Sequence, residues 1–156
     1  MTLIEGLAIF GGAMALGGGL AGSAMGIGNA ASSGAATLSE DSGQLRNVIV
    51  LASLPMTQSF YGLIVLIIIL TVVLPNLAAA AVGTGVAVMG IGIMAGLAQV
   101  FSATFQGAVC ASGIALLPKT RGRILTLAMM LAVFVELIGV LGLVFSIMAL
   151  SLLGLM

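Results

Sequence analysis

Charged side chains are almost absent from this sequence of 156 residues. Lysine and arginine together number four, aspartate and glutamate also number four, and the net charge is zero. Without a basic patch to neutralise phosphates, nucleic-acid binding is excluded. Hydrophobic residues make up 62% of the chain, which is more than a soluble domain of this size can bury. The composition therefore predicts an integral membrane protein.

Other residue types are also scarce. Tryptophan is absent, so the aromatic belt usual at a membrane interface is thin. The single cysteine, Cys110, excludes an internal disulfide and is interpreted as a small packing residue. The N-terminal stretch lacks the basic residues of a secretory signal peptide, so we interpret it as the first membrane span.

The few charges and one proline divide the chain into apolar segments. Charges gather at 40–46 and at 119–123, and an uncharged break falls at Pro75-Asn76, where proline and asparagine favour a turn. Each segment is long enough to cross a bilayer as a helix. The pattern predicts an all-α membrane protein of two antiparallel hairpins, residues 1–76 and 77–156. We expect its four transmembrane helices at 4–38, 45–74, 79–117 and 122–153.

The two hairpins resemble each other when the second is aligned with the first. One constant offset aligns Gly62 with Gly142 and Met56 with Glu136. The similarity is weak, but it is typical of a duplicated hairpin in which only the second copy carries the acid.

Small residues recur at every fourth position of the first predicted helix. In lipid, such a stripe lets helix backbones approach closely. Its length predicts a helix crowded along its whole extent, as at the inner wall of a ring. The stripe consists of Gly18, Gly22, Gly26, Ala30 and Gly34.

One carboxylate, Glu136, lies in the middle of the last apolar segment. A helix rises about 1.5 Å per residue, so Glu136 lies roughly 20 Å from Arg123, near the membrane midplane. An acid at this depth costs about 2.5–3.5 kcal/mol on insertion scales. It is either a protonated glutamate that faces a neighbouring helix or an ion or proton site.

Polar residues on two other predicted helices lie at the depth of Glu136. The separation along the chain from the basic residue of the adjoining charged loop is nearly the same for Gln58, Gln106 and Glu136. All three are therefore roughly 18–20 Å from the charged loops. Two helix faces carry these polar groups: Thr57, Gln58 and Tyr61 on the second helix, and Gln99, Ser102 and Gln106 on the third.

A proline inside the second predicted helix, Pro55, removes one backbone hydrogen bond and kinks the helix. Carbonyl groups near the kink, including that of Leu54, then become available to a ligand. Taken alone, the polar residues near this kink could equally serve to join helices by hydrogen bonds.

Together these residues resemble a known family, the four-helix proteolipid of V/A-type ATPases, which is the K or c subunit of the membrane rotor ring. The resemblance covers essentially the whole chain. It is carried by the pattern L-P-x-T-Q-x-x-Y at 54–61, by Gln106 and by Glu136. Na+-dependent members have this kinked segment, a glutamine on the third helix and a glutamate on the fourth. The family often has glycine where Met56 and Ser59 stand here.

The resemblance implies a Na+ site centred on Glu136 as the ion-binding carboxylate. Tyr61 would hydrogen-bond this carboxylate and close the site. Beyond the transported Na+, no cofactor is expected. The remaining ligands would be the side chains of Thr57, Gln58 and Gln106 and the carbonyl of Leu54.

The resemblance also implies a function, the translocation of Na+ or H+ coupled to ATP hydrolysis or synthesis on other subunits. The chain has no phosphate-binding loop and is not expected to be an enzyme on its own. Expected partners are further copies in a ring, a stator subunit of the a/I type, a central-stalk subunit of the d/C type and membrane lipid. Every lysine and arginine lies near 39–46 or 118–123, so the positive-inside rule places these loops in the cytoplasm. We expect a multi-pass protein of a prokaryotic plasma membrane.

Two other classes stay open. A small four-helix antiporter, which exchanges protons for a cationic substrate, also uses one membrane glutamate. The lack of tryptophan, the few other aromatic residues and the long glycine stripe speak against it. A purely structural packing protein would explain the glycines but not the polar residues at one depth.

Overall fold

The computed structural model describes residues 2–77 and 81–156, and these two ranges contain helices and turns but no strand. Four spans of 38, 36, 33 and 28 residues are long and apolar enough to cross a membrane. The second span is divided into several helical segments. In chain order the α-helices are α1 (Leu3–Glu40), α2 (Leu45–Ser53), α3 (Thr57–Ile68), α4 (Leu74–Leu77), α5 (Val82–Ala115), the single-turn α6 (Leu117–Thr120) and α7 (Leu125–Leu152).

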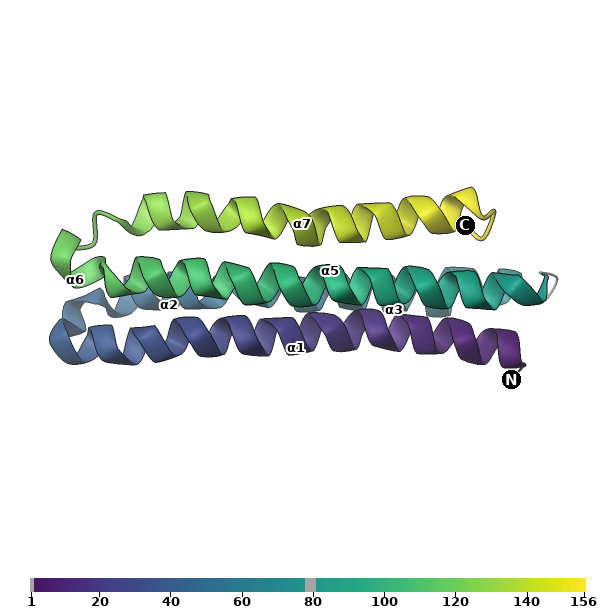
Figure 1. Cartoon of the computed structure of the whole chain (residues 1–156), viewed down its shortest axis with the longest axis horizontal. Coiled ribbons are helices and arrows are strands. Elements are labelled where there is room, and N and C mark those ends of the chain that lie inside the picture. Colours follow the sequence, from purple (N-terminus) through teal and green to yellow (C-terminus); the bar gives the residue numbers. More distant parts are fainter. Residues whose placement is uncertain (1, 78–80) are drawn as a thin grey trace.

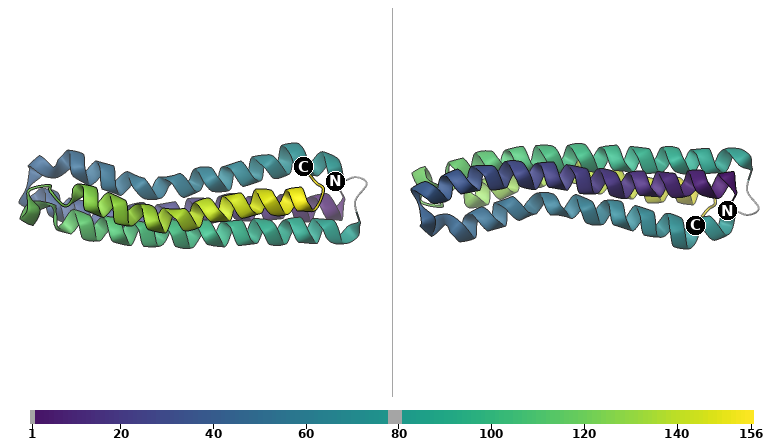
Figure 2. Two further views of the ribbon diagram at one scale, coloured as in Figure 1. Left: turned by 90° about the horizontal axis from the view of Figure 1, so that it is seen from above. Right: turned by 90° about the horizontal axis from the view of Figure 1, so that it is seen from below.

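The spans run antiparallel in one elongated bundle (Figure 1). The α1–α2 and α5–α7 connections lie at one end, which we call the loop end, and the start of α1 and the C-terminus lie at the other. Figure 2 shows α1 between α5 and the α2–α4 run, whereas α7 packs on α5 and also contacts α3. The predicted all-α fold of two antiparallel hairpins is confirmed.

The predicted break at Pro75-Asn76 is misplaced, because the second span continues as helix to Leu77. A π-helical stretch, Ile69–Val73, directly precedes the proline segment. The wider π turn accommodates a ring that would otherwise clash with the carbonyl four residues earlier. Residues 79 and 80 of the predicted third helix lie outside the described residues.

The last span begins at Leu125 and not at the predicted residue 122. The reason is a turn after α6 in which Arg121 and Gly122 have φ angles of 51° and 81°. These are left-handed conformations that a right-handed helix does not include.

The predicted kink at Pro55 is present as a single 3-10 turn, Leu54–Met56, between α2 and α3. Proline lacks the amide hydrogen that would continue the α-helical bonds. The whole α2–α4 run is curved and comes nearest to the other helices in its middle (Figure 2). The start of α3 is therefore held close to α5.

The glycine stripe of α1 packs against other helices of the same subunit. A Cβ atom added at Gly22 would lie 2.7 Å from the Cα of Val100 on α5, and one at Gly34 would lie 2.5 Å from the side chain of Val48 on α2. The other face of α1 is open, because a Cβ at Gly28 would meet nothing within 4 Å. The predicted crowding is thus found inside the subunit, and the position of α1 in a ring stays a prediction.

Two apolar cores occupy the two ends of the bundle. The core near the termini includes Ala8, Val65, Val88 and Leu150, and the core at the loop end includes Ala30, Leu51, Ile114 and Ala128. Between them lies a layer of fully buried polar side chains, about halfway along the bundle, which we call the polar layer. Its buried members are Gln58, Gln99, Ser102 and Gln106.

Candidate functional site

Glu136 on α7 is partly buried at the polar layer, and each of its carboxylate oxygens accepts a hydrogen bond. The hydroxyl of Tyr61 on α3 donates to Oε1 at 2.9 Å. The Nε2 of Gln106 on α5 donates to Oε2 at 3.2 Å. Donors from two other helices therefore stabilise an ionised carboxylate in a region with little other charge.

Two amide side chains connect α3 and α5 beside this carboxylate. The Nε2 of Gln58 donates to Oε1 of Gln106 at 2.9 Å and to Oγ of Ser102 at 3.0 Å. Ser102 in turn donates to the carbonyl of Val135 on α7 at 3.0 Å. These bonds link Gln58, Gln106 and Glu136 directly, in agreement with the prediction that they lie at one depth.

The 3-10 turn at the start of α3 gathers further oxygen atoms. Oγ1 of Thr57 lies 3.2 Å from the carbonyl oxygen of Leu54 and 3.1 Å from Oε1 of Gln58. The same Leu54 carbonyl also accepts from the backbone N–H of Thr57, which closes the turn. Carbonyl, hydroxyl, amide and carboxylate oxygens are the ligands that hard cations prefer.

The described residues contain no group of three or more histidine, cysteine, aspartate or glutamate side chains that could hold a metal ion. The oxygen atoms near Glu136 suit an alkali or alkaline-earth cation better than a transition metal.

The structure brings all the residues predicted for the site into one hydrogen-bonded group: Leu54, Thr57, Gln58, Tyr61, Gln106 and Glu136. The orientation of one amide could not be read from the sequence. The nitrogen of Gln106 faces Glu136, and its oxygen accepts from Gln58.

Two further members of the polar layer, and one glycine beside it, were not predicted as site residues. Ser102 and Gln99 share a helix face with Gln106, and their spacing in the sequence is the signal that could have identified them. Gly139 accepts a hydrogen bond from Gln99 through its carbonyl. A backbone acceptor of this kind has no signal in the sequence.

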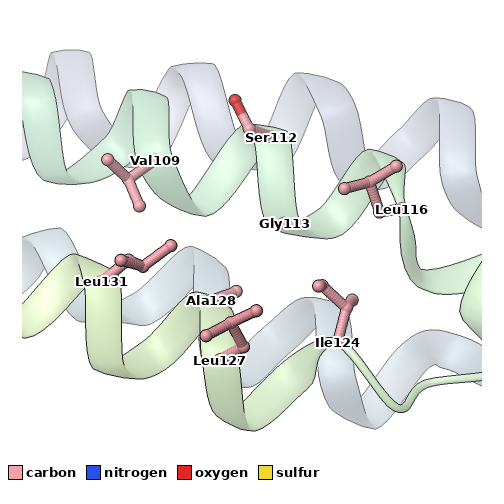
Figure 3. A pocket seen from close by; sticks show the side chains of 8 residues that line it. All are labelled: Val109, Ser112, Gly113, Leu116, Ile124, Leu127, Ala128 and Leu131. Atoms are coloured by element: carbon pink, nitrogen blue, oxygen red, sulfur yellow. The ribbon is translucent and has the colours of Figure 1, made fainter.

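A groove of about 280 Å³ lies between α5 and α7 towards the loop end (Figure 3). Its one polar side chain, Ser112, donates to the Ala108 carbonyl of its own helix at 3.1 Å. The groove contains no residue of the polar layer, so we do not place ion binding there. It is lined by Val109, Ser112, Gly113, Leu116, Ile124, Leu127, Ala128 and Leu131.

Comparison with known proteins gives one family. The family of the ATP synthase C subunit matches the chain twice, at residues 10–69 and 89–149. No curated protein matches the chain. The double match agrees with the internal repeat seen in the sequence, because each copy corresponds to two antiparallel spans.

Members of this family are membrane proteolipids that form oligomeric rings, work with an a subunit and stalk subunits, and translocate ions without being catalytic themselves. The four apolar spans and the acid at the polar layer fit this role. Because the two matches cover most of its length, the chain belongs to the family of the ATP synthase C subunit.

Proposed function

We propose that this chain is a rotor proteolipid of the V/A type and that it carries Na+ bound at Glu136. The observation that carries the proposal is the number of oxygen atoms gathered beside one carboxylate. A proton site needs little beyond a carboxylate and one hydrogen-bond partner. A hard cation needs more, and Na+ should need about five or six oxygen ligands by analogy with Ca²⁺ and Mg²⁺.

The spacing of the oxygens around Thr57 supports a cation. Its hydroxyl lies 3.2 Å from the Leu54 carbonyl and 3.1 Å from the Gln58 amide oxygen. Adjacent ligands of a cation with metal–oxygen distances of about 2.4 Å are about 3.4 Å apart in octahedral geometry. A small movement would therefore let these three oxygens share one Na+, and Glu136 would supply the carboxylate oxygen that neutralises it.

Two residues would complete and close the site. Gln106 would turn its amide over so that the oxygen, which now accepts from Gln58, becomes a ligand of the ion. Tyr61 would keep its hydrogen bond to the Glu136 carboxylate. Gln58 retains Ser102 as a partner for its amide nitrogen while this happens.

The mechanism follows from the cost of a bare charge in hydrocarbon. Na+ neutralises Glu136 while the ring turns through lipid, because an unpaired anion there is prohibitively unfavourable. A stator subunit of the a/I type would provide access from each side of the membrane and a basic residue that releases the ion. A central-stalk subunit of the d/C type would transmit rotation to the subunits that hydrolyse or synthesise ATP.

Carbodiimide labelling tests the Na+ assignment, because the reagent attacks a protonated carboxyl group. Millimolar Na+ should protect Glu136 in the intact ring and displace labelling to lower pH, since Na+ and H+ compete for one carboxylate. Gln106→Ala should weaken the protection. Ser112→Ala, which removes a hydroxyl outside the site, should not. If Na+ left labelling unchanged at every pH, the ion would be H+.

The orientation we propose puts the loop end in the cytoplasm of a prokaryotic cell, and the first hairpin includes the whole second span to Leu77, one residue beyond the predicted boundary at 76. Ser42 is exposed in the α1–α2 connection at the loop end, and Asn76 is exposed in α4, at the end of the second span away from that connection. Cysteines at the two positions should react with an impermeant thiol reagent from opposite sides. Reaction from the same side would contradict this topology.

Electron microscopy of the solubilised assembly separates a rotor from an antiporter. A ring of many helices would support the rotor, and a dimer would support the antiporter.

A further inference from the structure

Three side chains on one face of α5 donate hydrogen bonds to backbone carbonyls of α7. As the donors ascend α5, the acceptors descend α7, as antiparallel helices require. We call this set the carbonyl ladder. Its bonds run from Gln99 Nε2 to Gly139 (2.9 Å), from Ser102 Oγ to Val135 (3.0 Å) and from Gln106 Nε2 to Ala132 (3.4 Å).

Gln99 differs from the other two donors because it has no hydrogen bond to a side chain of the ion site. Ser102 also accepts from Gln58, and Gln106 also donates to Glu136. The Oε1 atom of Gln99 is fully buried and has no partner in the part of the chain that the structure describes. An apolar side chain would avoid the desolvation cost of that oxygen. The bond to α7 is therefore the reason for an amide at this position.

The α7 backbone comes within reach of Gln99 because two of its residues are glycines. A Cβ atom at Gly139 would lie 2.8 Å from Oε1 of Gln99 and 3.0 Å from Oγ of Ser102. A Cβ at Gly142 would lie 2.5 Å from the Cβ of Ala98 and 3.3 Å from Nε2 of Gln99. The two glycines form the surface on which the Gln99 amide lies.

We propose that Gln99 is a positioning residue for the ion site, which acts through Gly139 to fix the depth and rotation of α7. This inference rests on the proposed function of Glu136, which lies inside the ladder, three residues before Gly139. A slip of α7 by one turn, about 5.4 Å, would move Gly139 and Gly142 away from the Gln99 amide that packs on them. In hydrocarbon no water replaces a hydrogen bond that is lost there. The ladder thus holds the carboxylate opposite Tyr61 and Gln106.

Two variants that each remove one buried interhelical hydrogen bond test the proposal. Gln99→Met keeps the side-chain length and removes the amide. Thr37→Val is the matched control, because the hydroxyl of Thr37 on α1 donates to the carbonyl of Ile114 on α5 at 3.1 Å, near the loop end and away from the polar layer. The initial rate of carbodiimide labelling of Glu136 is measured in intact rings without Na+, together with the thermal stability of the rings.

Thr37→Val should lower thermal stability, and Gln99→Met should lower it less because it also removes the unpaired buried Oε1. Only Gln99→Met should raise the labelling rate, because only Gln99 holds α7 at the depth of the ion site. We expect a rise of about five-fold, the change that one hydrogen bond of ordinary net strength produces in an equilibrium. Gln99→Asn keeps the amide on a shorter side chain and should give an intermediate rate. Thr37→Val should leave the rate as in the unmodified ring.

An unchanged rate in Gln99→Met rings would overturn the proposal. So would the failure of both Gln99 variants to form rings, because Gln99 would then be needed for folding and not for position. If Glu136 in the unmodified ring could not be labelled at any pH, the proposed ion site itself would be wrong. Failure of the proposal for Gln99 and failure of the proposed ion site at Glu136 therefore give different results.

Discussion

Positions 19, 22 and 26 of α1 are glycines, and the corresponding positions of the second hairpin, on α5, are Gln99, Ser102 and Gln106. On α1 the glycines bring backbones together: a Cβ at Gly19 would lie 2.5 Å from the carbonyl oxygen of Gln58 on α3, and one at Gly22 would lie 2.7 Å from the Cα of Val100 on α5. In the second hairpin the three polar side chains fill the corresponding space and bond to α7. The same packing position is occupied by backbone in one copy and by hydrogen-bonding side chains in the other.

This difference explains why the membrane glutamate, Glu136, lies in the second hairpin and not in the first. A polar group in hydrocarbon needs room for its side chain and a partner for each of its atoms. Around Glu136 the second hairpin provides the room and the donor Gln106, and Tyr61 of the first hairpin provides the other donor. At the equivalent position of the first hairpin, Met56 is 47% exposed, and α1 offers glycine in place of donors. Gln58 and Tyr61 of the first hairpin instead belong to the hydrogen-bonded group around Glu136.

The largest effect should come from moving the acid between the hairpins. Glu136→Gln should reduce ion uptake into vesicles driven by the complete ATPase to background, because no carboxylate remains to bind the ion. Adding Met56→Glu should not restore uptake, since that exposed position has no Tyr61 or Gln106 beside it.

The control for this experiment is Glu5→Gln, which changes a carboxylate in the capping box at the start of α1. Glutamine also serves in capping boxes, so uptake should stay close to that of the unmodified protein. Restored uptake in the Met56→Glu, Glu136→Gln double variant would show that the site does not depend on the polar side chains of α5.

The next largest effect should come from filling the glycine contacts of the first hairpin. A Cβ at Gly26 would lie 2.7 Å from the Cβ of Pro55 and would also overlap the Ala103 carbonyl. Gly26→Leu should therefore cost about 3 kcal/mol of subunit stability, the upper end of the usual cost of overpacking, and abolish rings. Folding is measured by protease resistance, and assembly by ring yield.

Gly28→Leu separates folding from assembly, because nothing lies within 4 Å of a Cβ at Gly28. This variant should stay folded and lose rings if the open face of α1 contacts a neighbouring copy. Val133→Leu, on the exposed side of α7, should preserve both. A normal ring yield from Gly26→Leu would show that the tight glycine contact of the first hairpin is not required.

The polar layer could be predicted from the sequence because depth in a membrane follows from residue number along a helix. Gln58, Gln106 and Glu136 stand at similar distances from charged loops, and the structure links them by hydrogen bonds. The four spans followed from the same one-dimensional information. The helix end at Leu77 and the helix start at Leu125 were missed, since a π turn and a left-handed turn depend on local backbone geometry.

Partners across the bundle could not be predicted. A small-residue stripe shows which face of α1 is crowded, but it does not show that Gly22 meets Val100 of the same subunit. The direction of the Gln106 amide depends on Gln58, which is far away in the chain. Contacts of this kind are set by how the helices pack and not by the spacing along any one of them.

The smallest effect on stability should come from replacing one serine of the first hairpin by alanine. The same replacement in the second hairpin gives the most direct comparison of the two. Ser59 of α3 donates to the Gly19 carbonyl at 3.4 Å, which is long for a hydroxyl donor. Ser102 of α5 donates at 3.0 Å to α7 and accepts at 3.0 Å from Gln58. Both residues are buried or partly buried.

Ser59→Ala should lower the free energy of ring unfolding by less than about 0.5 kcal/mol, because a bond this long contributes little and the Gly19 carbonyl keeps its helical partner. Ser102→Ala should cost about 1–3 kcal/mol, because it removes an acceptor of Gln58 inside hydrocarbon together with one bond of the carbonyl ladder. Denaturant unfolding of the two rings measures the difference directly. An effect of Ser59→Ala as large as that of Ser102→Ala would mean that the first hairpin is also held by side-chain hydrogen bonds, and the contrast with its glycine contacts would have to be given up.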